Sequence, residues 1–209
     1  MQQVIVIHGG TTFQDYDIYL KSLSEKKLDI NRFIYRPMWK ELLQDNLGSE
    51  YQVLLPSMPN STNARYSEWK LWFEHISSLF SDNCILIGHS LGAVFLAKYL
   101  SENSLSVKIK ATVLIAAPYD DDSVEDLTDF KIVRLSERLT KQAGRIVFFN
   151  GMDDPVISNL DLSKYQNQLP AAEFKILSAP DHFVRADFPE LISLLKYIVR
   201  NSSTRGCQA

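Results

Sequence analysis

The 209-residue sequence predicts a three-layer α/β/α sandwich around a six-stranded, mostly parallel sheet. Two observations lead to this fold class: short apolar runs recur along the chain, and helical patterns separate them. Strands that alternate with helices form parallel sheets with helices on both faces. A third observation, a glycine-rich turn between one strand and the following helix, identifies the end of the sheet where a functional site is expected.

The composition indicates a single globular domain. The chain is 45% hydrophobic and 22% charged, so we expect one domain over residues 1–200 and a flexible tail over residues 201–209. A formal net charge of −3 gives no electrostatic reason to expect nucleic acid or an anionic membrane as a partner. The expected partner is therefore a small molecule, and whether a protein also binds stays open.

The two cysteines are placed unlike a disulfide pair. Cys84 lies inside an apolar run and Cys207 in the polar tail, and their spacing does not match a zinc site. The N-terminus shows neither the basic region nor the cleavage site of a signal peptide, and no apolar run is long enough to cross a bilayer. These features predict a cytoplasmic protein. No cofactor is expected.

The first strand is predicted at residues 4–7, because an uninterrupted apolar run of this length is typical of a strand buried on both faces. The second strand is predicted at residues 51–55, where Pro56 ends it. A helix is expected at residues 66–80, where apolar residues recur at helical spacing. His75 is expected on or beside the buried face of this helix.

Residues 14–48 form a longer connection than one crossover helix requires. Helical patterns cover residues 16–23 and 38–47, and Pro37 is placed where a first-turn proline would start the second helix. The surplus predicts either a flap over the site or ordinary packing, with packing favoured. Its aromatic residues are Tyr16, Tyr19, Phe33, Tyr35 and Trp39.

The second half of the chain continues the alternation. Strands are expected at residues 84–87, 111–116, 145–149 and 174–177. A helix directly follows the first of these strands, and residues 123–144 are expected to form a short helix and loop. An amphipathic helix is expected at residues 188–199.

The turn Gly88-His89-Ser90-Leu91-Gly92 matches the pattern G-x-S-x-G. Taken without its context, the match could equally be a chance run of small residues in a loop. A strand before it and a helix after it are the context in which such a turn exposes a serine Oγ, and glycines at both ends avoid collisions that a Cβ would cause. Ser90 is therefore the candidate nucleophile, with Gly88 and Gly92 as the motif glycines.

Backbone N–H groups near Ser90 are candidate donors to an oxyanion. Leu91 opens the predicted helix, where a free N–H and the helix dipole favour negative charge. The loop after the first strand contains Gly9 and Gly10, and the N–H groups of Gly10 and Thr11 are candidates for the second donor. An ordinary strand-ending turn explains these glycines equally well.

Two later loops supply a candidate acid and a candidate base, in the chain order Ser, Asp, His. Asp154 is the preferred acid because it projects from the end of a strand, and Asp153 is its rival. His182 is the preferred base because, of the four histidines, it lies in a late loop after a strand. His8 and His89 flank the site in sequence and are expected to shape it.

The acidic residues 120–122 form the clearest candidate for a metal site in the sequence. Consecutive carboxylates are more often part of a solvated loop, and no further ligands lie nearby in the sequence. No metal is therefore predicted.

Several motifs, spread over most of positions 4–199, carry a resemblance to a known family. They are Gly88-His89-Ser90-Leu91-Gly92-Ala93, Met58-Pro59-Asn60, Ala64-Arg65, Glu68-Trp69, Asp153-Asp154-Pro155, His182-Phe183 and Phe188-Pro189-Glu190-Leu191. The chain resembles the α/β-hydrolase superfamily, in particular the small, lid-poor branch that includes retinoblastoma-binding protein 9 and the bacterial YdeN-like serine hydrolases. The resemblance implies a minimal α/β-hydrolase fold with Ser90 as nucleophile, Asp154 as acid and His182 as base.

Two departures from the family pattern bear on function. The connection 14–48 is longer than this branch usually carries, so the family pattern does not specify what covers the pocket. No L-x-C-x-E stretch is present, and the resemblance gives no ground for binding a retinoblastoma-type pocket.

The expected reaction is that of a carboxylesterase, in which an acyl group passes from a small ester to water through an acyl-serine. Two alternatives stay open: a binding protein that uses the same fold without activity, and an acyltransferase or thioesterase. The sequence does not specify the acyl chain or the leaving group, because scattered residues build the pocket.

Overall fold

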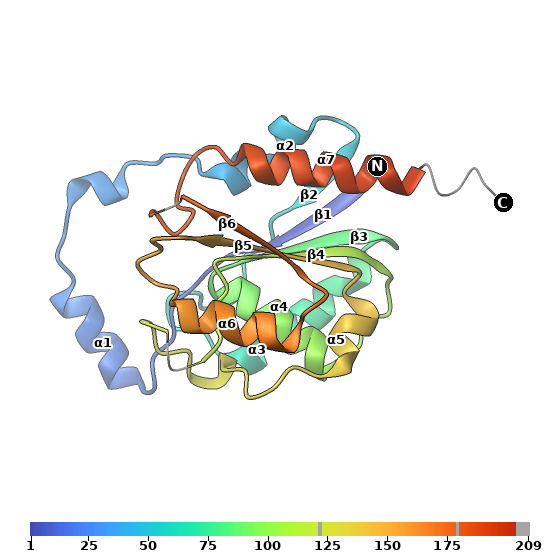
Figure 1. The fold of residues 1–209 in the computed structure, drawn as a ribbon. Helices are drawn as coiled ribbons and strands as arrows, with labels where there is room; N and C mark the ends of the chain where they lie inside the picture. Colours follow the sequence, from blue (N-terminus) through green and yellow to red (C-terminus); the bar gives the residue numbers. More distant parts are fainter. Residues whose placement is uncertain (121–122, 179, 204–209) are drawn as a thin grey trace.

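Six apolar segments form one parallel sheet in the computed structural model, which describes residues 1–120, 123–178 and 180–203 (Figure 1). The strands lie in the order β2-β1-β3-β4-β5-β6, and every neighbouring pair is parallel. Their bounds are Gln2–Ile7 (β1), Tyr51–Leu54 (β2), Cys84–His89 (β3), Ile109–Ile115 (β4), Arg145–Gly151 (β5) and Glu173–Leu177 (β6). The predicted fold class is confirmed.

The direction of strand addition reverses at β1. The second strand pairs with one side of β1 and β3 pairs with the other, so the rest of the sheet is built away from β2. At such a reversal the loops after the two neighbouring strands separate and leave room for a ligand. The loops after β1 and β3 are those that contain Gly10 and Ser90.

Helices cover both faces of the sheet (Figure 1). One face carries α2 and α7, and the other carries α3 to α6. The helices are α2 (Trp39–Leu47), α3 (Tyr66–Ile76), α4 (Leu91–Glu102), α5 (Glu137–Gln142), α6 (Asn159–Gln168) and α7 (Pro189–Ser203). Short 3-10 helices lie at Ile30–Phe33, Ser77–Leu79 and Thr128–Phe130.

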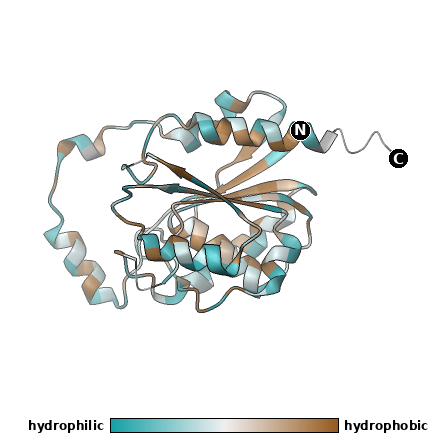
Figure 2. Ribbon diagram, in the orientation of Figure 1, coloured by the Kyte–Doolittle hydropathy of each residue, from teal (hydrophilic) through white to brown (hydrophobic). Residues whose placement is uncertain are grey.

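The sheet separates two apolar clusters, because successive side chains of a strand point to opposite faces. In β1, Val4 and Val6 join the cluster that includes Trp39 of α2, whereas Ile5 and Ile7 join the cluster under α4. Figure 2 shows the hydrophobic residues concentrated on the strands between the two helix layers. The strand with the nucleophile turn, β3, is buried along its whole length.

The helix α4 is buried almost completely. Ten of its twelve residues are buried, so it lies in the core and not on the surface of the domain. It packs against β1, β3 and β4 and against α5. The N-terminus of this helix, directly after Ser90, is therefore held from several sides.

The helix α1 (Tyr16–Glu25) and the 3-10 helix Ile30–Phe33 belong to an arm, residues 14–38, that lies outside the two helix layers (Figure 1). No residue of α1 is buried. The favoured prediction of ordinary packing is wrong for most aromatic residues of this segment, since Tyr16, Phe33 and Tyr35 are exposed. It is right for Trp39, which follows the arm and is 2% exposed.

The observed helices differ from the predicted ones at several points. The last helix, α7, continues to Ser203, so the predicted tail is wrong for residues 201–203, and residues 204–209 lie outside the described part of the chain. Pro37 precedes the N-cap residue Met38 and is not in the first turn of α2. The helix α6 was not predicted, because its sequence is polar.

His75 is exposed and does not lie on the buried face of α3, contrary to the prediction. The buried residues of that helix are Trp69 and Phe73, whereas Trp72 is 39% exposed and lies beside His75, with 5.9 Å between the two ring centroids. The apolar face of α3 is thus narrower than its sequence predicts.

No helix within the described residues is long and apolar enough to cross a membrane. The same part of the chain contains no group of three or more His, Cys, Asp or Glu side chains that could hold a metal ion. In the acidic segment, Asp120 pairs with Lys164 at 2.6 Å, whereas residues 121–122 lie outside the described part. Cys84 is a buried free thiol, and Cys207 lies outside the described residues.

Candidate active site

Ser90 occupies a sharp turn between β3 and α4. Its backbone has φ 53° and ψ −121°, a region that is costly for any residue with a Cβ and is found mainly at functional sites. The Ser90 N–H donates to Ile115 O at 2.9 Å, at the end of the neighbouring strand β4. The core therefore holds this strained turn in place.

The two motif glycines are required because the backbone packs closely around the turn. A Cβ at Gly88 would lie 2.5 Å from Gly92 O, and a Cβ at Gly92 would lie 2.2 Å from Ile7 O. Contacts this short are not seen for real Cβ atoms. The mechanical reason given for the glycines of the sequence motif is therefore confirmed.

The structure brings His182 and Asp154 together. The Nδ1 atom of His182 lies 2.9 Å from both carboxylate oxygens of Asp154. The Asp154 side chain is 1% exposed and the His182 side chain 14% exposed. Asp153, the rival acid, is exposed. Since Nδ1–H donates to the carboxylate, the other ring nitrogen, Nε2, is the one able to accept a proton.

Hydrogen bonds keep the Asp154 carboxyl ionised. Burial raises its pKa. The hydrogen bonds from His182 and from the Val156 and Ile157 N–H groups together lower the pKa by more than burial raises it, so the net pKa is below the ordinary value. An ionised carboxylate at Nδ1 fixes the orientation of the imidazole ring and stabilises its cation.

The loop that carries His182 is held by side chains from two other elements. His182 and Phe183 both have positive φ angles, 51° and 55°, which are unfavourable for residues with a Cβ. The Trp39 indole N–H donates to Phe183 O at 3.1 Å, and His89 Nε2 donates to His182 O at 2.9 Å. These two bonds fix the backbone carbonyls on which the position of the imidazole depends.

His89 is a buried, neutral histidine. Burial, with a further contribution from nearby His182, lowers the pKa of His89 to about 3. Its Nε2–H is donated to His182 O, and Nδ1 has no partner among the described residues. The expectation that His89 shapes the site agrees with this geometry, and its ring lies 5.3 Å from that of His182 between centroids.

His8 shapes the opposite side of the site. Its Nδ1–H donates to Gly9 O at 2.6 Å, and Nε2 accepts the Met58 N–H at 2.8 Å. Trp69 contacts the His8 ring edge-on and donates its indole N–H to Pro59 O. The Met58-Pro59 and Trp69 motifs of the sequence thus support the loop after β1.

Among the candidate oxyanion donors, two are compatible with the geometry. The Leu91 N–H lies in the first turn of α4, where N–H groups have no partner within the helix. Gly9 approaches the nucleophile so closely that a Cβ there would lie 3.7 Å from Ser90 Oγ, which places the Gly9-Gly10 backbone beside the serine. The Thr11 N–H, however, already donates to Ser61 O at 2.9 Å, so this candidate is engaged elsewhere.

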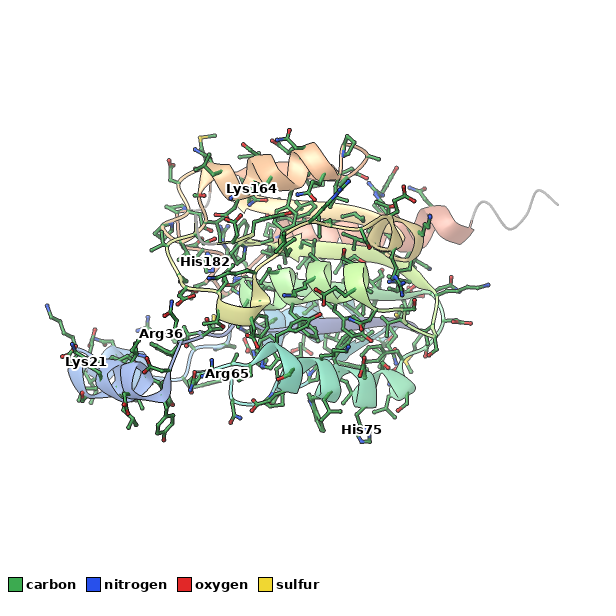
Figure 3. All side chains as sticks on the ribbon, turned by 90° about the horizontal axis from the view of Figure 1, so that it is seen from below. Lys21, Arg36, Arg65, His75, Lys164 and His182 are labelled. Atoms are coloured by element: carbon green, nitrogen blue, oxygen red, sulfur yellow. The ribbon has the colours of Figure 1, made fainter. Side chains whose placement is uncertain are left out.

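Figure 3 shows His182 at the end of the molecule from which the arm with Lys21 and Arg36 extends, far from His75 on α3. Sequence reasoning did not assign a role in the site to Trp39, because an indole at the start of a helix gives no sign of the distant carbonyl it binds. It also assigned no role to Glu125, whose sequence neighbours match no known motif.

The fold and the nucleophile turn define an α/β-hydrolase. A family model described as serine hydrolase matches residues 36–190, most of the chain, and the chain therefore belongs to the serine hydrolase family. A search of curated proteins gave no match.

Solved structures with the same fold include YdeN-like proteins and esterases. The ydeN gene product of B. subtilis has a TM-score of 0.70 and 17% identity, with 96% of this chain and 100% of that chain covered. A YdeN-like hydrolase described as putative, from Pectobacterium atrosepticum, has a TM-score of 0.56 and 14% identity, covering 94% and 92%. A Pyrococcus furiosus esterase has a TM-score of 0.57 and 15% identity, covering 96% and 82%. At these identities the likeness shows the shared fold.

Proposed function

We propose that this protein is an esterase that hydrolyses a small carboxylic ester through Ser90, His182 and Asp154. The observation that carries the proposal is the hydrogen bond between His182 Nδ1 and the buried, ionised carboxylate of Asp154. The loop of His182 is in turn linked to the nucleophile turn, because His89, the residue before Ser90, donates a hydrogen bond to the backbone carbonyl of His182. A strained serine turn and an oriented imidazole have this arrangement in nucleophilic catalysis.

In the first half of the reaction, Ser90 Oγ attacks the ester carbonyl carbon while His182 Nε2 takes the hydroxyl proton. The carbonyl oxygen becomes negative and accepts hydrogen bonds from the Leu91 and Gly10 N–H groups. The tetrahedral intermediate then collapses, the bond to the leaving oxygen breaks, and His182 donates its proton to the departing alcohol. An acyl-serine remains.

In the second half, water replaces the alcohol. His182 Nε2 takes a proton from this water, the resulting hydroxide attacks the acyl-serine, and the bond to Ser90 Oγ breaks as His182 returns the proton to it. The carboxylic acid leaves and the enzyme is restored. Throughout, Asp154 stabilises the imidazolium without taking the proton.

The test is labelling with a fluorophosphonate probe, followed by mass spectrometry of the modified peptide and by turnover of 4-nitrophenyl acetate. We expect the label on Ser90, no label in Ser90→Ala, and labelling at least about a hundredfold slower in His182→Ala. The matched control is Ser24→Ala, which removes an exposed serine of α1 and should label as the wild type does.

A folded wild-type protein that resists the probe and turns over no ester would contradict the proposal and would favour a binding role for the fold. A change of product when an alcohol or a thiol is added would instead identify acyl transfer to that acceptor. A probe attached to another residue, with Ser90→Ala still labelled, would exclude Ser90 as the nucleophile.

A further inference from the structure

The loop after β4 brings one carboxylate next to the candidate triad. The Val124 N–H donates to Val156 O at 3.4 Å, two residues after Asp154. On the other side, the Thr12 hydroxyl donates to Asp126 O. The two sequence neighbours of Glu125 are therefore hydrogen-bonded to different loops: Val124 to the loop that carries Asp154, and Asp126 to the loop after β1.

Glu125 has no ionic or hydrogen-bonding partner within residues 1–120, 123–178 and 180–203. Its neighbour Asp126 differs, because one Asp126 oxygen accepts the Thr128 N–H and lies 3.9 Å from Lys131 Nζ. Burial raises the pKa of the Glu125 carboxyl, the charge of His182 lowers it, and the charge of Asp154 raises it. A partly desolvated carboxylate without a counter-charge is costly in a folded protein.

A cavity of about 400 Å³ adjoins this carboxylate. Its lining combines residues of the loop after β1, the start of the arm and the loop after β4: Thr11, Thr12, Phe13, Gln14, Ile18, Glu125 and Asp126. The cavity thus has an apolar side formed by Phe13 and Ile18 and an acidic side formed by Glu125. Such a combination suits a cationic group with alkyl substituents, which needs both a counter-charge and apolar contact.

We propose that Glu125 binds a cationic group of the substrate, a quaternary ammonium, in the cavity beside the triad. The inference rests on the proposed esterase function and specifies its substrate class. The ammonium supplies the direct ionic partner that Glu125 lacks among the described residues, and the contact fixes the ester relative to Ser90. The cation lies either on the acyl chain or on the alcohol.

The test compares pairs of esters that have the same shape and differ in charge. For the acyl side, the pair is 4-nitrophenyl 4-(trimethylammonio)butanoate and 4-nitrophenyl 5,5-dimethylhexanoate. For the alcohol side, the pair is acetylcholine and 3,3-dimethylbutyl acetate. The quantity measured is the ratio of kcat/KM for the cationic ester to that for its neutral partner, so that a general loss of activity cancels.

In the wild type we expect this ratio to be about ten- to hundredfold above one for one of the pairs, and the pair identifies the side that carries the cation. In Glu125→Gln the ratio should fall to about one. The matched control is Glu50→Gln, which should keep the wild-type ratio. This exposed glutamate directly precedes β2 and so lies at the N-terminal end of the strand, whereas the candidate site lies at the C-terminal ends of the strands.

A measurement on the wild type alone covers the case in which Glu125→Gln does not fold. Choline and 3,3-dimethylbutanol are compared as inhibitors of 4-nitrophenyl acetate hydrolysis, and choline should bind at least about tenfold more tightly. Equal inhibition, a wild-type ratio of one in both pairs, or an unchanged ratio in a folded Glu125→Gln would overturn the assignment.

The failure of this inference and that of the esterase proposal are distinguishable. Labelling of Ser90 with equal turnover of charged and neutral esters would overturn the charge assignment alone. Absence of both labelling and turnover would overturn the esterase function and the assignment with it.

Discussion

The helices α1 and α4 each follow a loop that borders the candidate active site, yet they meet the sheet in opposite ways. Ten of the twelve residues of α4 are buried, whereas none of α1 is. Both helices carry large apolar residues, such as Leu96 in α4 and Leu20 in α1. The sequence of α4 is nonetheless the more apolar of the two, so composition accounts for part of the difference in burial.

The position at which each helix begins also contributes to the difference in burial. The turn at Ser90 directs α4 onto the centre of the sheet, beside β1, β3 and β4. The chain that follows Thr12 leaves the sheet before α1 begins, and the arm returns only at Trp39 (Figure 1). The nucleophile is thus held by a rigid core, while the cavity on the other side is lined by the less constrained start of the arm.

Hydrogen exchange should reveal the largest difference between the two helices. Amides of α4 are expected to exchange only when the whole domain unfolds, at a cost of about 5–15 kcal/mol, whereas amides of α1 should exchange with little protection. Mass spectrometry of peptides covering residues 91–102 and 16–25 measures this directly, with the C-terminal helix α7 as a reference. Similar protection of the amides in α1 and α4 would mean that α1 packs against the rest of the domain in solution, which would contradict the difference in burial between the two helices.

Paired truncations should give the next largest effect. Leu96→Ala removes a fully buried side chain, and we expect a loss of about 2–5 kcal/mol in the free energy of unfolding. Leu20→Ala removes a side chain that is 44% exposed, and its effect should stay within about 0.5 kcal/mol. Denaturant titration measures both. A loss above about 1 kcal/mol for Leu20→Ala, twice the value typical of surface positions, would contradict the exposed position of α1.

The smallest expected effect is on the pH dependence of the free energy of unfolding, to which the buried core around β3 and the exposed surface should contribute differently. The pKa of His89, at the end of β3, is lowered to about 3, so below pH 6.5 the unfolded state binds a proton that the folded state does not. Stability should therefore fall as the pH falls from 6.5, by at most about 1.4 kcal/mol per pH unit from this group.

The variant His89→Gln should lose this part of the slope, since a glutamine amide can still donate to His182 O but does not titrate. His75→Gln, at an exposed histidine of α3, is the control and should keep the wild-type slope. Denaturant midpoints from pH 4.5 to 7.5 measure the effect. An identical slope in His89→Gln and the wild type would mean that His89 does not stay neutral in the folded state.

The sequence was sufficient for the sheet and for the turn at Ser90. Buried strands such as β3 read as continuous apolar runs because both of their faces are covered, and each was predicted to within a few residues. The glycines at 88 and 92 are visible in the sequence because no other residue fits the backbone there. Asp154 and His182 could be chosen because the C-terminal ends of parallel strands share one edge.

Other features depended on contacts between distant parts of the chain. The exposure of α1 and of His75 reflects which surface another element covers, and amphipathic spacing records only that an apolar face exists. The bonds from Trp39 and His89 to the carbonyls of residues 183 and 182 leave no sequence signal, because any residue supplies a carbonyl. Glu125 became a candidate for substrate binding when the fold placed it beside Asp154 without a cationic partner among the described residues. Local backbone chemistry thus determined the nucleophile and the strands, whereas long-range packing decided the surroundings of the site.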